Sequence, residues 1–201
     1  LGPVFDAASD GLGTMVVGTR VWAHPNGVHP SLPWYSRLSL GGSVVAFGVL
    51  PGADGRTPGV DPSVVLAGDK WAVAWAAVPE AQEAADADWG IRLGFFAPVM
   101  EGVGGAFSGL EQVGDVRVIS TGVAEGPSLV WTGDELGLAW AGDDGDGGTA
   151  VHFGRFDADG APVGEAVRIS GAERAGAEAV VVSNGEGFAL AWTEEEAGFG
   201  A

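Results

Sequence analysis

Carboxylate side chains gather in two short, glycine-rich segments of this 201-residue chain. The candidate oxygen ligands are Asp143, Asp144, Asp146, Asp157 and Asp159. Clustered carboxylates are the groups that Ca²⁺ binds, usually with about six to eight oxygen ligands in all. Neither segment has the spacing of an EF-hand loop, which ends on a glutamate. The sequence therefore leaves two interpretations open, a calcium site or a solvated acidic face.

A second group of candidate residues lies in the segment 17–42. This segment holds two of the three histidines, the only tyrosine and two of the eight tryptophans. The candidate ligand-binding residues are Trp22, His24, His29, Trp34 and Tyr35. Long loops on a rigid scaffold often carry binding function, and histidines are common metal ligands. The alternative is that the aromatic rings pack the segment against the rest of the protein.

Motifs for catalysis are absent from the sequence. It has no Gly-x-Ser-x-Gly elbow for a serine nucleophile, no phosphate-binding loop and no dinucleotide-binding fingerprint. No pair among the 27 aspartates and glutamates is singled out for glycoside hydrolysis. The absence of cysteine excludes disulfides, thiolate metal sites and cysteine nucleophiles. The sequence therefore predicts a protein that is not an enzyme.

The elements that must position these groups belong to a repeated motif. The segment from Pro127 to Trp140 matches residues 62–75 and 179–192 without a gap, and residues 3–16 more weakly. A second motif occurs at residues 45–50, 91–96 and 151–156. Each unit is expected to form four short strands joined by Gly- and Asp-rich turns, with the second motif as the third strand. Tandem units of this kind are typical of β-propeller blades.

Two aligned positions in the repeats have expected structural roles. The second strands end on Trp75, Trp140 and Trp192. We expect these rings to fill the space between neighbouring sheets, with sugar-binding platforms as the alternative. The first turns carry Asp10, Asp69, Asp134 and Glu186. A turn aspartate usually accepts hydrogen bonds from nearby backbone, so a structural role is expected here too. Residues 79–87 are expected to form an acidic loop.

Three parts of the repeat resemble secreted bacterial β-propeller repeat proteins of a Gram-negative, myxobacterial type. They are the hairpin from Pro127 to Trp140, the Phe153-Gly154 strand, and the Asp159-Gly160 turn before Val167–Ser170. The resemblance implies an all-β chain of antiparallel four-stranded blades in tandem, about three and a half of them, within a larger propeller. A four-bladed ring and an open stack of sheets are the alternatives. The resemblance also implies an extracellular or cell-envelope location, and it transfers no catalytic residue.

The predicted organisation is a single repeat region that spans residues 1–201. Its units are 3–61, 62–126, 127–178 and an incomplete 179–201, with an insertion at 17–42. The chain is strongly acidic, with 9 Lys and Arg against 27 Asp and Glu and a net charge of −18. Such a field repels phosphate backbones, so nucleic-acid binding is not expected. No apolar run reaches the length of about 18 residues that a transmembrane helix needs.

These observations predict a non-catalytic, extracellular repeat scaffold that makes protein or glycan contacts. Two alternatives remain open at this point. One is a calcium-dependent, lectin-like carbohydrate-binding domain. The other is a structural subunit whose exposed blade edges pair with further repeats of the same polypeptide or with another copy. No cofactor other than calcium is expected.

Overall fold

The computed structural model describes residues 5–24, 27–51, 59–77, 90–171 and 174–196, without the side chains of 20–31, 174–175 and 195–196. All regular secondary structure in these residues is β, which confirms the all-β part of the predicted fold class. The predicted acidic loop at 79–87 lies outside the described residues. In the described part of the chain, no helix is long and apolar enough to cross a membrane.

The described strands form three four-stranded antiparallel sheets and one hairpin. The first sheet contains β1 (Phe5–Ser9), β2 (Gly13–His24), β3 (Gly27–Ser39) and β4 (Val44–Val49). The second contains β5 (Gly59–Ala67), β6 (Lys70–Ala77), β7 (Gly90–Glu101) and β8 (Ala106–Val118). The third contains β9 (Ala124–Trp131), β10 (Leu136–Asp143), β11 (Thr149–Phe156) and β12 (Val167–Arg168). The hairpin of β13 (Arg174–Ser183) and β14 (Phe188–Glu196) comes last, and within every sheet the strands lie in sequence order.

One side chain caps the turn between the first two strands in three of these sheets. The capping residues are Asp10, Thr132 and Asn184, and each accepts hydrogen bonds from the backbone N–H groups two and three residues further on. Such side-chain caps stabilise a tight loop through hydrogen bonds to the backbone of the loop itself. The second sheet has a shorter turn, in which Gly68 adopts a φ of +67° that suits glycine.

These caps correct the predicted alignment of the first repeat by two residues. Asp10 is equivalent to Thr132 and Asn184, whereas the gap-free match had paired it with Asp134. The same shift makes Gly18, and not Val16, the equivalent of the aligned tryptophans. Sequence matching missed this because Asp, Thr and Asn can all cap the turn, so the shared role leaves no shared residue type.

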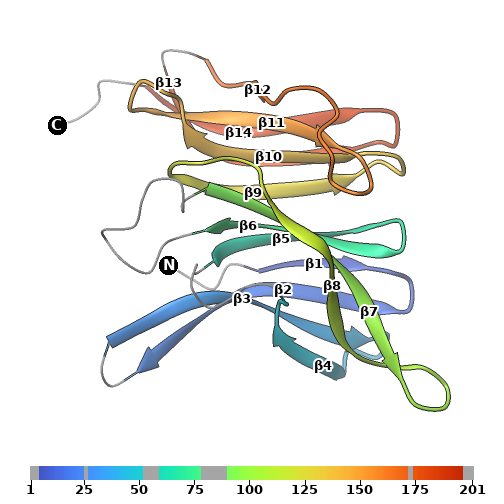
Figure 1. Cartoon of the computed structure of the whole chain (residues 1–201). Coiled ribbons are helices and arrows are strands. Elements are labelled where there is room, and N and C mark those ends of the chain that lie inside the picture. The colour runs from blue at the N-terminus through green and yellow to red at the C-terminus, as the bar shows by residue number, and fades with distance from the viewer. Residues whose placement is uncertain (1–4, 25–26, 52–58, 78–89, 172–173, 197–201) are drawn as a thin grey trace.

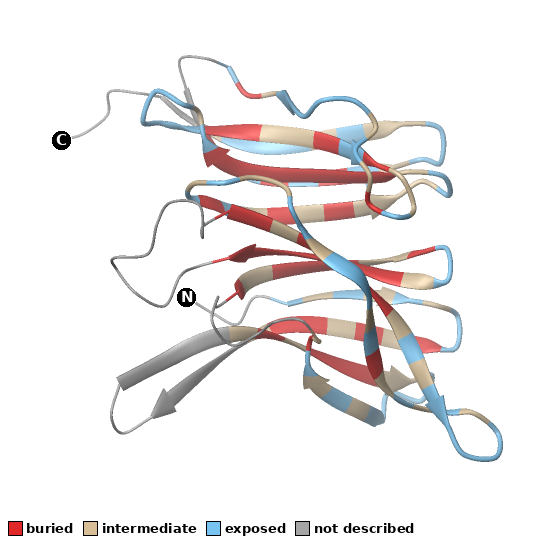
Figure 2. Cartoon of the chain, viewed as in Figure 1, coloured by how far each residue is buried: buried red, intermediate tan, exposed pale blue. Residues whose placement is uncertain are grey.

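The sheets stack face to face in sequence order (Figure 1), and one core cluster joins each neighbouring pair. Met15 of the first sheet shares a cluster with Trp71 of the second. The other two clusters contain Leu93 with Leu138, and Val151 with Val181. The buried residues accordingly run along the strands inside the stack (Figure 2). Trp75 and Trp140 are 4% and 3% exposed, which confirms their predicted packing role.

A ladder of side-chain hydrogen bonds links the first strands of successive sheets. Asp6 Oδ2 accepts a bond of 2.9 Å from the N–H of Val64. Ser63 Oγ accepts one of 3.1 Å from the N–H of Leu129, and Ser128 Oγ one of 3.1 Å from the N–H of Val181. Because each bond joins equivalent positions, the first strands run in the same direction and in the same register. All four therefore begin at one end of the stack.

The propeller prediction is confirmed only in its coarser part, the repeated antiparallel sheets of four strands. The described sheets form an open stack and do not close into a ring (Figure 1). Phe47 on the outer face of the first sheet is 73% exposed, and Val180 on the outer face of the last hairpin is 54% exposed.

The first sheet also corrects the predicted order of its strands. The motif at 45–50 was expected to form the third strand, but it lies in β4, the fourth. The third strand is β3, which lies largely inside the predicted insertion and pairs along nearly its whole length with β2. The shared motif marks a glycine under an aromatic ring: a Cβ at Gly48 would lie 3.2 Å from Tyr35, and one at Gly94 3.2 Å from Trp75. Both strand positions need that glycine, so the motif does not identify the strand.

Candidate functional site

The starting residues of the first strands meet at one end of the stack, which we call the leading edge (residues 59–62, 124–127 and 176–179). In each sheet the second strand ends beside them, since Gly59 pairs with Ala77 and Ala124 with Gly142. The hydrogen-bond ladder fixes the direction of these strands, so the leading edges of the three sheets lie side by side. Side chains from segments about 60 residues apart in sequence are therefore brought to one end of the molecule.

A β-bulge interrupts β5, β9 and β13, the first strands of these three sheets, at the same place on the leading edge. The bulges contain Asp61, Gly126 and Glu178, whose φ angles are +50°, +57° and +48°. Among the described residues, Asp61 and Glu178 are the only non-glycine residues with positive φ. This conformation is uncommon for residues with a Cβ. Gly126 shows that the bulge is compatible with glycine, so the two carboxylates occupy it at a conformational cost.

Asp61 is the most unusual of these carboxylates. It is partly buried beside the buried Pro62, and burial raises the pKa of its carboxyl above the ordinary value. Within the described part of the chain it has no hydrogen-bond or ion-pair partner that would stabilise the charged form. Glu125 and Glu178 on the neighbouring first strands are exposed. The leading edge thus combines one carboxyl whose pKa is raised by burial with two that face solvent. Bulges commonly redirect side chains next to active sites.

The predicted calcium ligands of the β10–β11 loop lie at the same end but serve the loop itself. Asp143 Oδ1 accepts the N–H of Gly145 at 2.7 Å. Asp144 Oδ1 accepts the N–H groups of Asp146 and Gly148, each at 2.9 Å. The pKa of Asp144 is lowered chiefly by these backbone bonds. Two of the three carboxylates thus have the structural role that a turn aspartate usually has.

The other two predicted ligands lie at the opposite end of β11. Asp157 Oδ1 accepts the N–H groups of Asp159 and Ala161, and the Asp159 carboxylate contacts Lys70 Nζ at 2.7 Å. A strand of this length separates them from the β10–β11 loop by roughly 25 Å. No three His, Asp or Glu side chains within the described residues are placed to hold one metal ion. The calcium site stays a prediction, and the structure does not bring its five residues together.

The structure places the five predicted aromatic and histidine residues in different environments. Trp22, His24 and His29 lie on the long β2–β3 hairpin, with Trp22 directly opposite His29, and their side chains lie outside the described residues. Trp34 is partly buried, and its ring covers Gly18. Tyr35 is 6% exposed in the core between the first two sheets, with its ring 6.5 Å from that of Phe107. Tyr35 is therefore a core residue, and a binding role for the other four stays a prediction.

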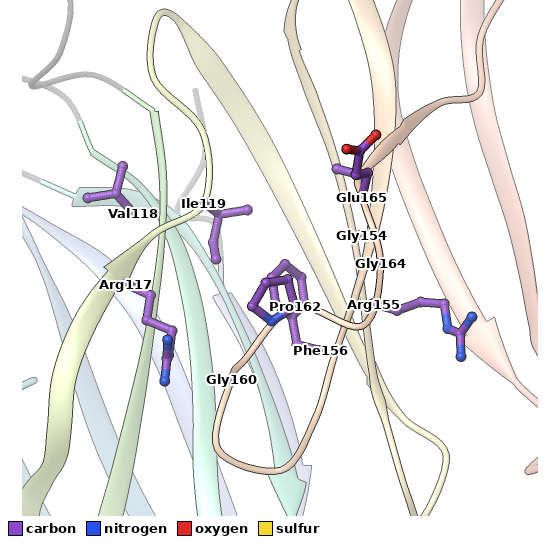
Figure 3. Close-up of a pocket in the computed structure, with 11 residues that line it drawn as sticks. Arg117, Val118, Ile119, Gly154, Arg155, Phe156, Gly160, Pro162, Gly164 and Glu165 are labelled. Carbon is purple, nitrogen blue, oxygen red and sulfur yellow. The ribbon is translucent and has the colours of Figure 1, made fainter.

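A cavity of about 350 Å³ lies on the flank of the stack, between the second and third sheets (Figure 3). Phe156 and Pro162 line it together with Arg117, Arg155 and Glu165. Arg117 donates to the backbone carbonyl of Asp159, and Arg155 donates to both oxygens of Glu135. The cavity therefore offers a single carboxylate, Glu165, and both guanidinium groups already have partners. Chemistry that needs two carboxylates does not find them in this cavity.

Sequence reasoning missed Asp61, Glu125 and Glu178. The matched segments began at Pro62, Pro127 and Ala179, one residue after the bulge position. An alignment extended by one residue would have placed Asp61, Gly126 and Glu178 in one column. A column that combines acidic residues with glycine indicates a left-handed backbone position.

No family model and no curated protein sequence matches the chain. Solved structures do resemble it. An α-L-arabinofuranosidase from Lactobacillus brevis superposes with a TM-score of 0.52 at 11% identity, over 94% of this chain and 63% of that one. A xylan β-1,4-xylosidase from Bacillus halodurans C-125 gives a TM-score of 0.34 at 14% identity, over 98% of this chain and 50% of that one. The chain thus spans less than two thirds of either enzyme.

The first of these likenesses shows the fold, and the second is too weak to carry an argument. The prediction of a non-catalytic scaffold, with lectin-like and edge-assembling alternatives, is contradicted by this likeness, because the solved structure that shares the fold is that of an enzyme, an α-L-arabinofuranosidase. The predicted export and the resemblance to myxobacterial repeat proteins are tested by none of these findings and stay predictions.

Proposed function

We propose that the chain belongs to a glycoside hydrolase and that its catalytic carboxylates lie at the leading edge. The observation that carries this proposal is the positive φ of Asp61, at a position where the third sheet has glycine. Non-glycine residues in this region cost about 1–3 kcal/mol each and cluster at active sites. The fold shared with an arabinofuranosidase supports the same assignment.

Asp61 has the properties of the general acid. Its burial favours the neutral carboxyl, which can donate a proton to the glycosidic oxygen as the bond to the leaving group breaks. Glu125 on the neighbouring strand is exposed and has the properties of the general base, which removes a proton from the attacking water. A carboxylate that activates water as general base, paired with a separate general acid, is the arrangement of inverting glycosidases. The proposal therefore includes inversion at the anomeric carbon.

The test is hydrolysis of aryl glycosides by the purified protein, starting with aryl α-L-arabinofuranoside and aryl β-D-xyloside. Asp61→Asn should lower kcat by about 10²–10⁴-fold, the usual contribution of a general acid. Glu125→Gln should lower kcat by a similar factor, and NMR of the first product should show the inverted anomer.

Asp69→Asn is the matched control, because Asp69 is an exposed aspartate at the other end of β5. It should leave kcat and KM unchanged. Failure to cleave any aryl glycoside, or equal loss in Asp61→Asn and Asp69→Asn, would overturn the proposed function.

A further inference from the structure

The outer face of the last hairpin repeats a pattern that the two preceding sheets bury. In the second sheet Val65, Ala72 and Ala74 face the third sheet, and both alanines are fully buried. The equivalent residues of the third sheet are Val130, Gly137 and Ala139, and they face the last hairpin. In the last hairpin the same positions hold Val182, Ala189 and Ala191. All three of these are exposed.

At two of the three interfaces between the described sheets the packing follows one rule at these positions. A large side chain at the start of the second strand faces the preceding sheet, and a small residue of that sheet receives it. At the first interface Trp71 instead shares a core cluster with Met15, which holds this position in the first sheet. Leu136 shares the core cluster with Ala72. Phe188 lies so close to Gly137 that a Cβ there would come within 2.5 Å of its ring. A small residue that receives no large one leaves an unfilled surface, and this is the state of Ala189.

We propose that the outer face of the β13–β14 hairpin (Val182, Ala189 and Ala191) docks a further sheet of the same repeat type, carried by the same polypeptide. In the further sheet, the residue at the start of the second strand faces Ala189, and we expect it to be about the size of leucine. Ala189 carries a Cβ, as Ala72 does opposite Leu136, whereas the larger Phe188 ring requires Gly137. Val180 is the equivalent of Asp6, Ser63 and Ser128, each of which accepts a hydrogen bond from the next sheet. Valine has no such acceptor, so the contact between the hairpin and a further sheet is apolar at this position.

A second copy of the chain does not fit this face head to tail. The first sheet would have to supply the large residues, but it has Thr14 where the other sheets have Trp71, Leu136 and Phe188. At the position of the aligned tryptophans it has Gly18. Thr14 against Ala189 would leave a gap where a well-packed interface has none. The packing pattern thus favours a further repeat over head-to-tail association.

The experiment uses the absence of cysteine in the chain, which makes a single introduced thiol a clean probe. Val182→Cys is placed in the chain as it stands and in a version extended after Glu196 by a copy of residues 145–196. This copy completes the last sheet and adds one further hairpin in phase. Its Phe188 equivalent is changed to Leu, and in the matched control extension the same residue is changed to Asp.

The thiol of the unextended chain should react rapidly with a maleimide. In the Leu extension the rate should fall at least about tenfold, because a buried thiol reacts only through local opening. In the Asp extension it should stay fast. Equal rates in the Leu extension and the unextended chain would overturn the proposal. A slow rate in the unextended chain that rises on dilution would also overturn it, in favour of a second copy.

A second measurement needs no extension. Because the face is uncovered in this chain, Ala191→Glu should shift its Tm by less than about 2 °C, as surface substitutions usually do. Ala74→Glu, at the equivalent buried position, should unfold the chain. A large fall in Tm for Ala191→Glu would show that the face is already covered, and would contradict the proposal.

Discussion

Arg37 and Asp10 join the third strand of the first sheet to the turn of its first hairpin through an ion pair with little solvent exposure. Nη2 of Arg37 lies 2.7 Å from Oδ1 and 2.6 Å from Oδ2 of Asp10. The guanidinium also lies 5.7 Å from the ring centre of Trp71 in the second sheet. The Asp10 carboxylate therefore caps the turn of the first hairpin and binds Arg37 of the third strand. Through Arg37 it is also connected to Trp71 at the interface with the second sheet.

Replacing Arg37 should destabilise the protein strongly. Removing one partner of a buried pair leaves the other charge uncompensated, at a cost of about 3–5 kcal/mol. Arg37 is 6% exposed but Asp10 retains some solvent contact, so we expect Arg37→Met to cost about 3 kcal/mol, near the lower end of that range. Urea denaturation measures this free energy. Arg155→Met is the matched control, because the Arg155–Glu135 pair is more exposed and should contribute less than about 1 kcal/mol. Similar losses for both variants would contradict the assignment.

The same carboxylate should make stability fall in acid. Burial by itself would raise the pKa of Asp10, but the hydrogen bonds from Arg37 and from the N–H groups of Leu12 and Gly13 outweigh it and lower the pKa. A carboxyl whose folded pKa is depressed stabilises the fold above its unfolded pKa of 3.8 and loses this contribution as pH falls through the folded value. Asp10→Asn keeps the cap oxygen but not the charge. Its free energy of unfolding should converge on that of the unsubstituted chain below about pH 4. A constant difference between pH 7 and pH 2 would refute the linkage.

The strands and much of their packing could be predicted from the sequence, because the evidence for them is local. The hairpin pattern is repeated in residues 62–75 and 127–140, and Trp75 and Trp140 are buried as expected. Trp192 departs from the rule with 36% exposure, since its hairpin has no described third strand to cover the ring. The position of Asp10 was mistaken because different residue types can cap one turn.

The leading edge could not be predicted for a different reason. Asp61 and Glu125 lie on different strands, and the ladder from Ser63 to Leu129 that brings those strands together is a contact between sheets. The positive φ of Asp61 and Glu178 is likewise invisible in a single sequence, because a bulge has no unique residue signature. Two of the calcium candidates, Asp144 and Asp157, were singled out by a local pattern that the structure assigns to turns.

The hydrogen-bond ladder predicts unequal effects for two equivalent serines. Ser63→Ala removes the acceptor for the N–H of Leu129, and this bond is buried. An unsatisfied buried N–H costs about 1–3 kcal/mol. Ser128→Ala removes the acceptor for the N–H of Val181, which is only partly buried, so water can replace it at a lower cost. Chemical denaturation should therefore rank Ser63→Ala as the more damaging variant. Equal losses would mean that the ladder does not stabilise the stack in the way proposed.

Replacing Asp61 by glycine should separate stability from activity. Glycine adopts the bulge conformation without the cost that a Cβ brings, and it also removes a partly buried carboxyl, so Asp61→Gly should stabilise the fold by up to about 1 kcal/mol. The same variant should lose glycoside hydrolysis, because no other group on that strand can replace the acid. Gly126→Ala is the converse control at the equivalent bulge: it should destabilise by a similar amount and leave the carboxylates in place. Thermal melts and aryl glycoside assays on the two variants make the comparison. If Asp61→Gly is less stable than the unsubstituted chain, the carboxylate holds the bulge together and its conformation is no evidence of a catalytic role.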